Sequence, residues 1–198
     1  MSASAPLVLA SGSPRRRRAL EELGVAFEVV PADDDGPARD ADPAGRVLAH
    51  ARHKAAAVAG ARPDAWVLAA DTLVVRDGRF LGKPADAAAA RAMLEELSGG
   101  AHEVWTGSVL LAPGGRPFAE RAERATVRFR RLAADELDAY LAGDEWRDKA
   151  GAYGIQGWAG ERAEVAAGDF AVVVGAPIAT WRRFLRDAGL LAPSGDAC

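Results

Sequence analysis

Apolar residues follow two periods along the chain, and the two periods alternate. Apolar or alternating runs predict strands, and they lie at residues 7–10, 27–30, 66–70, 73–75, 79–81, 102–111, 118–132 and 170–174. Apolar residues at helical spacing predict helices at residues 15–23, 43–59, 85–97, 135–142 and 177–188. Strands interleaved with helices predict an α/β fold with a mixed, twisted sheet and flanking helices.

Turn and loop residues divide these elements. Asp77-Gly78 lies between two apolar runs and predicts a β-hairpin. The acidic segment 31–43 contains proline and glycine, and we expect a mobile loop there. Residues 191–198 are expected to form a flexible C-terminal tail. Residues 1–190 are then expected to form a single domain with two lobes around a central cleft.

Composition narrows the class of protein. The chain has 198 residues, of which 49% are hydrophobic and 27% charged, as in a folded globular protein. The net charge of -3 argues against a protein that wraps nucleic acid with a basic face. The single cysteine, Cys198, excludes an internal disulfide and a cysteine-rich metal site. The N-terminus lacks signal-peptide features, and no apolar run could span a bilayer. We therefore expect a soluble cytoplasmic protein with neither a nucleic acid nor a membrane as partner.

The segment Ser11-Gly12-Ser13-Pro14-Arg15-Arg16 lies where a predicted strand ends and a helix begins. Free backbone N–H groups at a helix start attract anions, and arginine adds planar donors that match phosphate oxygens. The segment therefore suits a polyphosphate. The alternative is a capped helix that carries a solvated basic run, residues 15–18.

Asp71 and Thr72 are expected at the end of the predicted strand 66–70. Open α/β sheets bind ligands beside strand ends, so this carboxylate is well placed for a metal or a water. The alternative is a turn that simply ends the strand. Lys83 follows Gly82 just before a predicted helix and could reach a phosphate, or could be an ordinary turn residue.

Three glycines lie within the segment 148–157, where a backbone can approach a ligand closely. Lys149 supplies a charge there, and the amide of Gln156 can form hydrogen bonds with a base edge. The alternative is an irregular connection, although one of this length is uncommon without a function. His50 and His53 lie three residues apart on a predicted helix and could suit a metal, but no third ligand is near them.

Taken together, these segments resemble the Maf family of nucleoside triphosphate pyrophosphatases, in one order over about residues 7–188. The matching segments are Ser11-Gly12-Ser13-Pro14-Arg15-Arg16, Ala51-Arg52-His53-Lys54-Ala55, Ala70-Asp71-Thr72, Lys83-Pro84, Ser98-Gly99 with His102, residues 148–157, and Gly175-Ala176-Pro177. Several motifs at matching spacing are more specific than any single one.

The resemblance implies a fold shared with the inosine triphosphate pyrophosphatases, and cleavage of a nucleoside triphosphate to a monophosphate and pyrophosphate with Mg²⁺ or Mn²⁺. Asp-Thr followed by Gly-Ile-Gln-Gly resembles the branch that acts on dTTP and UTP. By the resemblance, Asp71 is the catalytic base and a metal ligand, and specificity lies with Arg15, Thr72 and Gln156. The other implied substrate-binding residues are Ser11, Ser13, Arg16, Lys54, Lys83 and Lys149.

The chain departs from the family pattern in the loop after the second strand, where the family has an acidic pair that often binds the metal. The last position of that pair falls on Gly36, so Asp35 is expected to replace it, or Asp34 with a shift of one residue. His53 stands where glutamate is common, and Trp146 where proline is common.

Two other functions stay open from the sequence. The same reaction could act on 7-methyl-GTP or another modified nucleotide. Because proteins similar to this family are also associated with arrest of septum formation, the chain could instead be a non-catalytic regulator that acts by binding. The resemblance also implies a homodimer.

Overall fold

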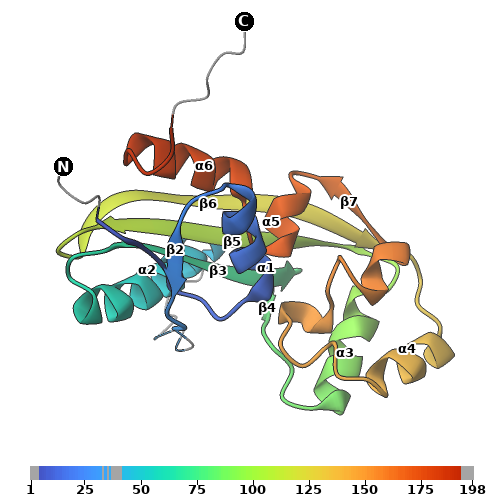
Figure 1. Cartoon of the computed structure of the whole chain (residues 1–198). Coiled ribbons are helices and arrows are strands. Elements are labelled where there is room, and N and C mark those ends of the chain that lie inside the picture. The colour runs from blue at the N-terminus through green and yellow to red at the C-terminus, as the bar shows by residue number, and fades with distance from the viewer. Residues whose placement is uncertain (1–4, 33, 35, 37–41, 193–198) are drawn as a thin grey trace, which may run out of the picture. The chain divides into compact units, whose positions relative to one another are not determined.

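The computed structural model describes residues 5–32, 34, 36 and 42–192 (Figure 1). Most of the loop expected to be mobile at 31–43 and the end of the tail expected at 191–198 lie outside the described residues. Among the helices that are described, none has the length and apolar character needed to cross a membrane.

The chain divides into two compact units. Of the described residues, unit 1 comprises those up to Asp71, residues 107–122 and those from Gly175 onward, and unit 2 comprises residues 72–106 and 123–174. The predicted single domain and the predicted cleft stay predictions.

The described strands form one mixed sheet in the order β2-β1-β3-β5-β6-β7, with β4 paired to β3. Their bounds are β1 Leu7–Leu9, β2 Phe27–Val29, β3 Trp66–Arg76, β4 Arg79–Leu81, β5 Ala101–Ala112, β6 Arg116–Phe129 and β7 Ala163–Ala167. β1 is parallel to β2 and to β3, whereas β4 is antiparallel to β3 and β7 to β6. The helices are α1 Pro14–Glu22, α2 Pro43–Ala61, α3 Ala87–Leu97, α4 Ala134–Leu141, α5 Phe170–Val174 and α6 Ile178–Asp187, with short 3₁₀ turns η1 Ala150–Ala152 and η2 Trp158–Glu161. The predicted α/β fold with a mixed sheet and flanking helices is confirmed.

Helices cover both faces of the sheet in unit 1. Ala51, Ala55 and Val58 of α2 join a buried cluster with alternate residues of β1, β3 and β5. On the opposite face, Trp181 of α6 donates from Nε1 to Ser108 Oγ at 2.8 Å. Figure 1 shows α2 and α6 on opposite sides of these strands.

Helix α2 lies unusually close to β5 at Gly107. A Cβ atom at Gly107 would stand 2.6 Å from the carbonyl carbon of Val47, well inside van der Waals contact. Glycine therefore permits the approach of the helix backbone to the strand.

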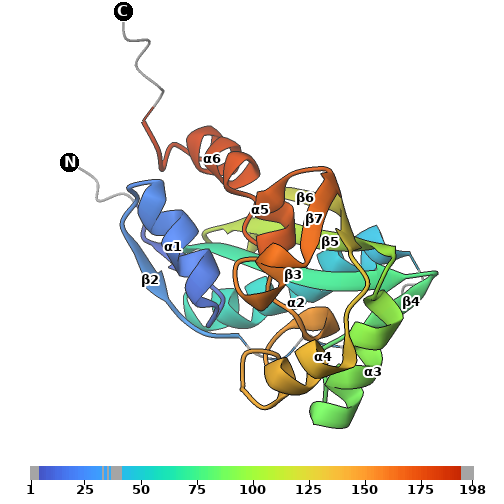
Figure 2. The ribbon, with the colours of Figure 1, turned by 90° about the vertical axis from the view of Figure 1, so that its right-hand side faces the viewer.

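In unit 2, helices α3 and α4 lie side by side (Figure 2). Their apolar faces share one core with Phe129 of β6 and with Trp146. Ala152, Tyr153 and Ile155 are buried in the same core. The glycine-rich segment 148–157 is therefore anchored by its own apolar side chains.

The predicted hairpin is confirmed. β3 pairs with β4 up to Arg76 opposite Arg79, and the two residues between them both have positive φ, 48° at Asp77 and 78° at Gly78. Positive φ at both positions is typical of the tight turn that matches the twist of two strands.

The predicted strand over residues 170–174 is wrong, because these residues form helix α5. A short apolar run fits either structure, so the flanking residues decide. Asp169 accepts hydrogen bonds from the N–H of Ala171 at its side chain, at 2.8 Å, and from the N–H of Val172 at its carbonyl oxygen, at 3.0 Å. Those bonds start a helical turn.

The expected end of a strand at Asp71 is also wrong. β3 runs without interruption from Trp66 to Arg76, so Asp71 lies inside the strand. The apolar residues Val74 and Val75 are buried beyond it, and pairing with β4 extends the strand. The short strand β7 had no clear sequence pattern and was not predicted.

Candidate active site

A small hydrogen-bond network in unit 1 holds the start of α1. Arg16 donates from Nε to the carbonyl oxygen of Gly175 at 2.9 Å and from Nη1 to Ser11 Oγ at 3.1 Å. The backbone N–H of Ser13 donates to the same Ser11 oxygen at 3.3 Å. The side chain of Ser13 makes no capping bond to α1, and Arg15 is half-buried at the helix start. Arg16 and the backbone of Ser13 thus meet at the buried Ser11 hydroxyl.

Asp71 is held by two donors from α2. Lys54 Nζ donates to Asp71 Oδ1 at 2.6 Å, and His50 Nδ1 lies 2.9 Å from Asp71 Oδ2. The side chains of all three residues are at most 9% exposed. His50 and Lys54 are four residues apart and therefore project from the same face of the helix.

The Asp71 carboxyl group is ionised at neutral pH. Burial by itself would raise its pKa, because a buried charge loses hydration. The hydrogen bond from His50, the charge and hydrogen bond of Lys54 and the charge of Arg16 outweigh burial and lower the pKa to about 2. The structure therefore brings Asp71, Lys54 and Arg16 into one electrostatic neighbourhood, with His50 as an additional member.

A divalent metal fits this carboxylate only in part. An ionised carboxylate oxygen is the donor that Mg²⁺ prefers, and Mg²⁺ is commonly held by one or two carboxylates together with substrate phosphates. Within the described residues no group of three histidine, cysteine or acidic side chains stands together. Asp71 thus fits a site that phosphate oxygens complete. Asp35, the other predicted metal ligand, lies outside the described residues.

Asp34 contacts α2 through His53. Its Oδ1 accepts a bond from the N–H of Gly36 at 2.8 Å, and its Oδ2 lies 3.3 Å from His53 Nε2. These two contacts lower the pKa of Asp34. His50 and His53 therefore serve two different acids, which argues against a metal site made of the two histidines.

The hydroxyl of Thr72 has a defined donor role. Thr106 donates its only hydroxyl hydrogen to the carbonyl oxygen of Val172 at 2.8 Å. Thr106 Oγ1 lies 3.0 Å from Thr72 Oγ1, so in this pair Thr72 must be the donor. With its hydrogen used, Thr72 can meet a ligand only as an acceptor.

In unit 2 the segments that carry Lys83 and Lys149 are joined. The N–H of Gly151 donates to the carbonyl oxygen of Gly82 at 3.0 Å. Lys149 is held by the carbonyl oxygen of Glu145 at 2.9 Å and by Asp148 at 2.5 Å. Lys83 and Gln156 are exposed, so both side chains can be reached from solvent.

A buried histidine anchors the same segment. His102 Nε2 lies 2.7 Å from the hydroxyl oxygen of Tyr153, and Phe129 stacks on the His102 ring at 5.9 Å. Burial and the charge of Arg76 lower the pKa of His102 to about 4, and burial raises the pKa of Tyr153. The pair is therefore neutral at neutral pH, and it fixes Tyr153 three residues before Gln156.

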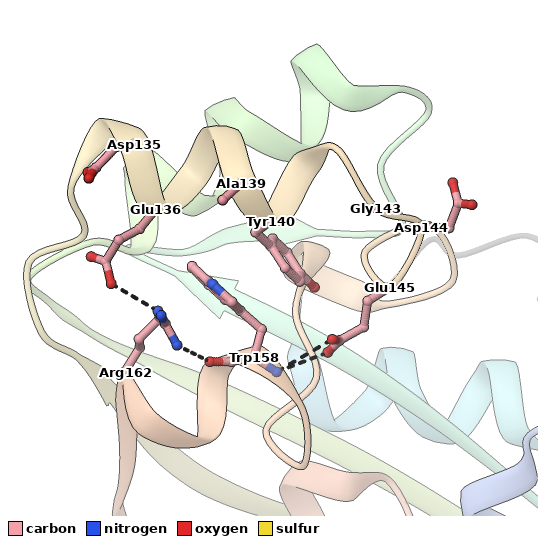
Figure 3. Close-up of a pocket in the computed structure, with 9 residues that line it drawn as sticks. All are labelled: Asp135, Glu136, Ala139, Tyr140, Gly143, Asp144, Glu145, Trp158 and Arg162. Atoms are coloured by element: carbon pink, nitrogen blue, oxygen red, sulfur yellow. Dashed lines mark hydrogen bonds and ion pairs between the residues drawn. The ribbon is translucent and has the colours of Figure 1, made fainter.

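A pocket of about 530 Å³ lies in unit 2 (Figure 3). Its lining residues are Asp135, Glu136, Ala139, Tyr140, Gly143, Asp144, Glu145, Trp158 and Arg162. Trp158 stacks on Tyr140 at 4.3 Å, the guanidinium of Arg162 lies over the Trp158 ring at 4.7 Å, and Figure 3 shows Trp158 between them. Four carboxylates against one guanidinium disfavour a triphosphate here.

Sequence reasoning missed His50 and Thr106. His50 was weighed only as half of a metal pair, and Thr106 was not considered. The spacing of His50 and Lys54 was a signal, because residues four apart on a helix share a face. No local pattern pointed to Thr106, which meets Thr72 through the sheet.

An α/β fold with an ionised carboxylate beside a lysine and an arginine suits the class of proteins that handle phosphate groups. The sequence model of the family described as Maf-like protein matches residues 6–188. The chain therefore belongs to the Maf family, and the resemblance seen in the sequence is confirmed.

Two relatives illustrate the similarity. A protein of Moorella thermoacetica named dTTP/UTP pyrophosphatase is 50% identical over 87% of this chain and 89% of its own length. A protein of Deinococcus radiodurans with the same name is 44% identical over 94% of both chains. A solved HAM1 protein from Coxiella burnetii is 15% identical, with a TM-score of 0.49 over 93% of this chain and 100% of its own.

Proposed function

We propose that the chain is an enzyme that hydrolyses dTTP and UTP to the nucleoside monophosphate and pyrophosphate. Relatives that are 44% and 50% identical over most of the chain carry the name of this activity. The observation in the structure that carries the proposal is the buried, ionised Asp71 between Lys54 and His50.

Asp71 accepts the proton of the water that attacks the α-phosphorus. With a pKa of about 2 the carboxylate is a weak base, and Lys54 contributes two of the effects that lower this value. When Lys54 turns from Asp71 to a phosphate oxygen, those effects weaken and the basicity of Asp71 rises. Arrival of the substrate thereby strengthens the base.

The basic residues bind the triphosphate. Lys54 and Arg16 neutralise charge that develops on the leaving pyrophosphate. Ser11, Ser13 and Arg15, at the start of α1, add hydrogen-bond donors for phosphate oxygens. In unit 2, Lys83 and Lys149 supply further positive charge to the nucleotide. Positioning and electrostatics then account for most of the acceleration, as in other phosphoryl transfers.

A divalent cation, Mg²⁺ or Mn²⁺, would be held by Asp71 and an acidic residue of the 33–35 segment, Asp35 in the first instance. When bound, it supplies charge neutralisation on the triphosphate and makes a coordinated water more acidic.

Thr72, Gln156 and Arg15 set the preference for the base. Thymine and uracil present an N–H donor at N3 between two carbonyl acceptors. Thr72 can act only as an acceptor, and the Gln156 amide offers both an acceptor and donors. A base that leaves such groups unpaired is rejected, since an unsatisfied polar group costs free energy.

The test is pyrophosphate release from dTTP, UTP, 7-methyl-GTP and dATP with Mg²⁺ or Mn²⁺. We expect dTTP and UTP to react at least about tenfold faster than the others, judged by kcat/KM. A preference for 7-methyl-GTP would assign the chain to the other branch. No release from any nucleotide would favour the regulator that acts by binding. Action in the cytoplasm, as a homodimer and without nucleic acid or membrane, stays a prediction; the elution volume on size-exclusion chromatography tests the dimer.

A further inference from the structure

Two donors on one face of α2 serve the two oxygens of Asp71 separately. Lys54 Nζ donates a hydrogen bond to Oδ1 at 2.6 Å, and His50 Nδ1 lies 2.9 Å from Oδ2. Each donor restricts rotation of the carboxylate about its last side-chain bond, and the donor that stays still restricts this rotation when the other leaves. The two donors together therefore fix the plane of the Asp71 carboxylate.

The nitrogen of His50 that faces Asp71 must carry a hydrogen. An ionised carboxylate only accepts hydrogen bonds, so Nδ1 is the donor. His50 Nε2 is buried and has no hydrogen-bond partner among the described residues. A hydrogen placed on Nε2 instead of Nδ1 would be buried without an acceptor and would also cost the bond to Asp71.

The close packing of α2 against the sheet keeps His50 in place. Gly107 of β5 allows the backbone of Val47 to come within a distance that any Cβ would prevent. Val47 lies one turn before His50 on the same helix. Helix α2 thus has little freedom to move away from β3, where Asp71 lies.

We propose that His50 is a positioning residue for the reaction: it holds Asp71 in its reactive orientation after Lys54 has turned to the phosphate. This inference rests on the proposed function. While Lys54 binds Asp71, both donors orient the carboxylate. Once Lys54 donates to a phosphate oxygen instead, His50 is the α2 donor that still binds Asp71. Loss of His50 is therefore felt in turnover rather than in substrate binding.

The experiment compares four forms of the full chain: the parent, His50→Leu, His50→Asn and Arg52→Gln. Leucine has a similar volume without a donor, whereas the amide of asparagine can replace Nδ1–H. Arg52 lies on the same helix but pairs with Glu120 at the surface, so Arg52→Gln is the matched control. kcat and KM for dTTP are measured, and the protonated ring nitrogens of the parent without nucleotide are assigned by ¹H–¹⁵N NMR.

We expect His50→Leu to lower kcat about tenfold or more and to leave KM within about twofold of the parent. A loss of this size is typical when a residue that orients a reactive side chain is removed. His50→Asn should recover most of the loss, Arg52→Gln should match the parent, and the NMR spectrum should show a hydrogen on His50 Nδ1. Kinetics of His50→Leu equal to the parent, a folded His50→Asn no better than His50→Leu, or a bare Nδ1 would overturn the proposal.

Two outcomes keep the tests separate. If His50→Leu does not fold, near-parental activity of His50→Asn together with the nitrogen spectrum supports the role, and a bare Nδ1 refutes it. If the parent releases no pyrophosphate, the proposed function fails, and the role of His50 in turnover falls with it. If the parent is active and His50→Leu has the same kcat and KM, only the role of His50 is refuted.

Discussion

Two buried histidines, one in each unit, illustrate how partners decide the role of a side chain. His50 is 6% exposed and His102 3%, and each has one ring nitrogen without a hydrogen-bond partner among the described residues. His50 faces the ionised Asp71, beside a lysine. His102 faces the neutral hydroxyl of Tyr153, beside the ring of Phe129.

The surroundings of the two histidines differ in charge, and this difference determines what each histidine does. In unit 1, buried charges are paired, so that Asp71 stays ionised and oriented. In unit 2, a neutral aromatic cluster fixes the backbone of a segment, and that leaves Gln156 exposed at its end. Similar burial of the same residue type thus organises the carboxylate of Asp71 in one place and the segment that carries Gln156 in the other.

The largest expected effect on stability is in the charged region around Asp71. Lys54→Met removes the cation from Asp71 and leaves a buried carboxylate with a single donor. We expect the free energy of unfolding, from urea denaturation at neutral pH, to fall by about 3 kcal/mol or more.

Arg52→Gln gives the contrast on the same helix. The Arg52 ion pair with Glu120 is exposed, at 52% and 42% of the two side chains, and its loss should cost no more than about 1 kcal/mol. Equal costs for the two variants would mean that the Asp71–Lys54 pair behaves like a surface ion pair.

The neutral cluster around His102 predicts that the free energy of unfolding depends on pH at values above the pKa range of the carboxylates. The pKa of His102 is lowered from 6.5 to about 4, so the unfolded chain takes up a proton that the folded chain refuses. This stabilisation is complete above the unfolded pKa and is lost as the pH falls toward 4; we expect about 2 kcal/mol to be lost between about pH 8 and about pH 5. His102→Gln keeps a donor for Tyr153 but does not titrate, and should flatten that part of the curve. An unchanged curve would show that His102 is protonated equally in both states.

Asp71 predicts a second, lower pH range in which the free energy of unfolding changes. Its pKa falls from 3.8 to about 2, so its stabilising effect is present above the unfolded pKa and is lost as the pH falls through 4 toward 2. The effect amounts to roughly 2 kcal/mol, about half of it lost by about pH 3. Urea denaturation of the parent and Asp71→Asn from about pH 5 to about pH 3 measures it. A difference between the two proteins that does not change with pH would contradict the lowered pKa.

A smaller expected effect, on catalysis alone, concerns specificity. Gln156→Glu replaces an amide that can donate with a carboxylate that cannot, on an exposed residue. We expect the ratio of kcat/KM for dTTP over 7-methyl-GTP to fall by about tenfold, or about 1.4 kcal/mol, with no change in Tm. An unchanged ratio would remove Gln156 from recognition of the base.

Local sequence signals predicted the fold well where turn chemistry is specific. Asp77-Gly78 predicted a tight hairpin, since only a few residue types accept positive φ at both positions. The strand predicted at residues 170–174 is wrong because a short apolar run has no period of its own, and the hydrogen bonds that Asp169 accepts start a helix there. The strand through Asp71 was cut short because an acidic residue looked like a turn, although partners from α2 let it remain in the strand.

The candidate site was predicted as separate residues rather than as contacts. Asp71 and Lys54 were both singled out, but their bond depends on how α2 is set against β3, and this is not encoded in any local pattern. Thr106 was missed for the same reason, because it meets Thr72 across neighbouring strands. Contacts between distant segments come from packing, which spacing along the chain does not show.

The central claim is that the ionised Asp71 performs the chemistry on a pyrimidine nucleoside triphosphate. Pyrophosphate release from dTTP by the parent and by Asp71→Asn, with dTTP binding measured by calorimetry on the same samples, tests it most directly. We predict that turnover falls by about a thousandfold while dTTP binding persists. Turnover of Asp71→Asn at the parental rate would contradict the account.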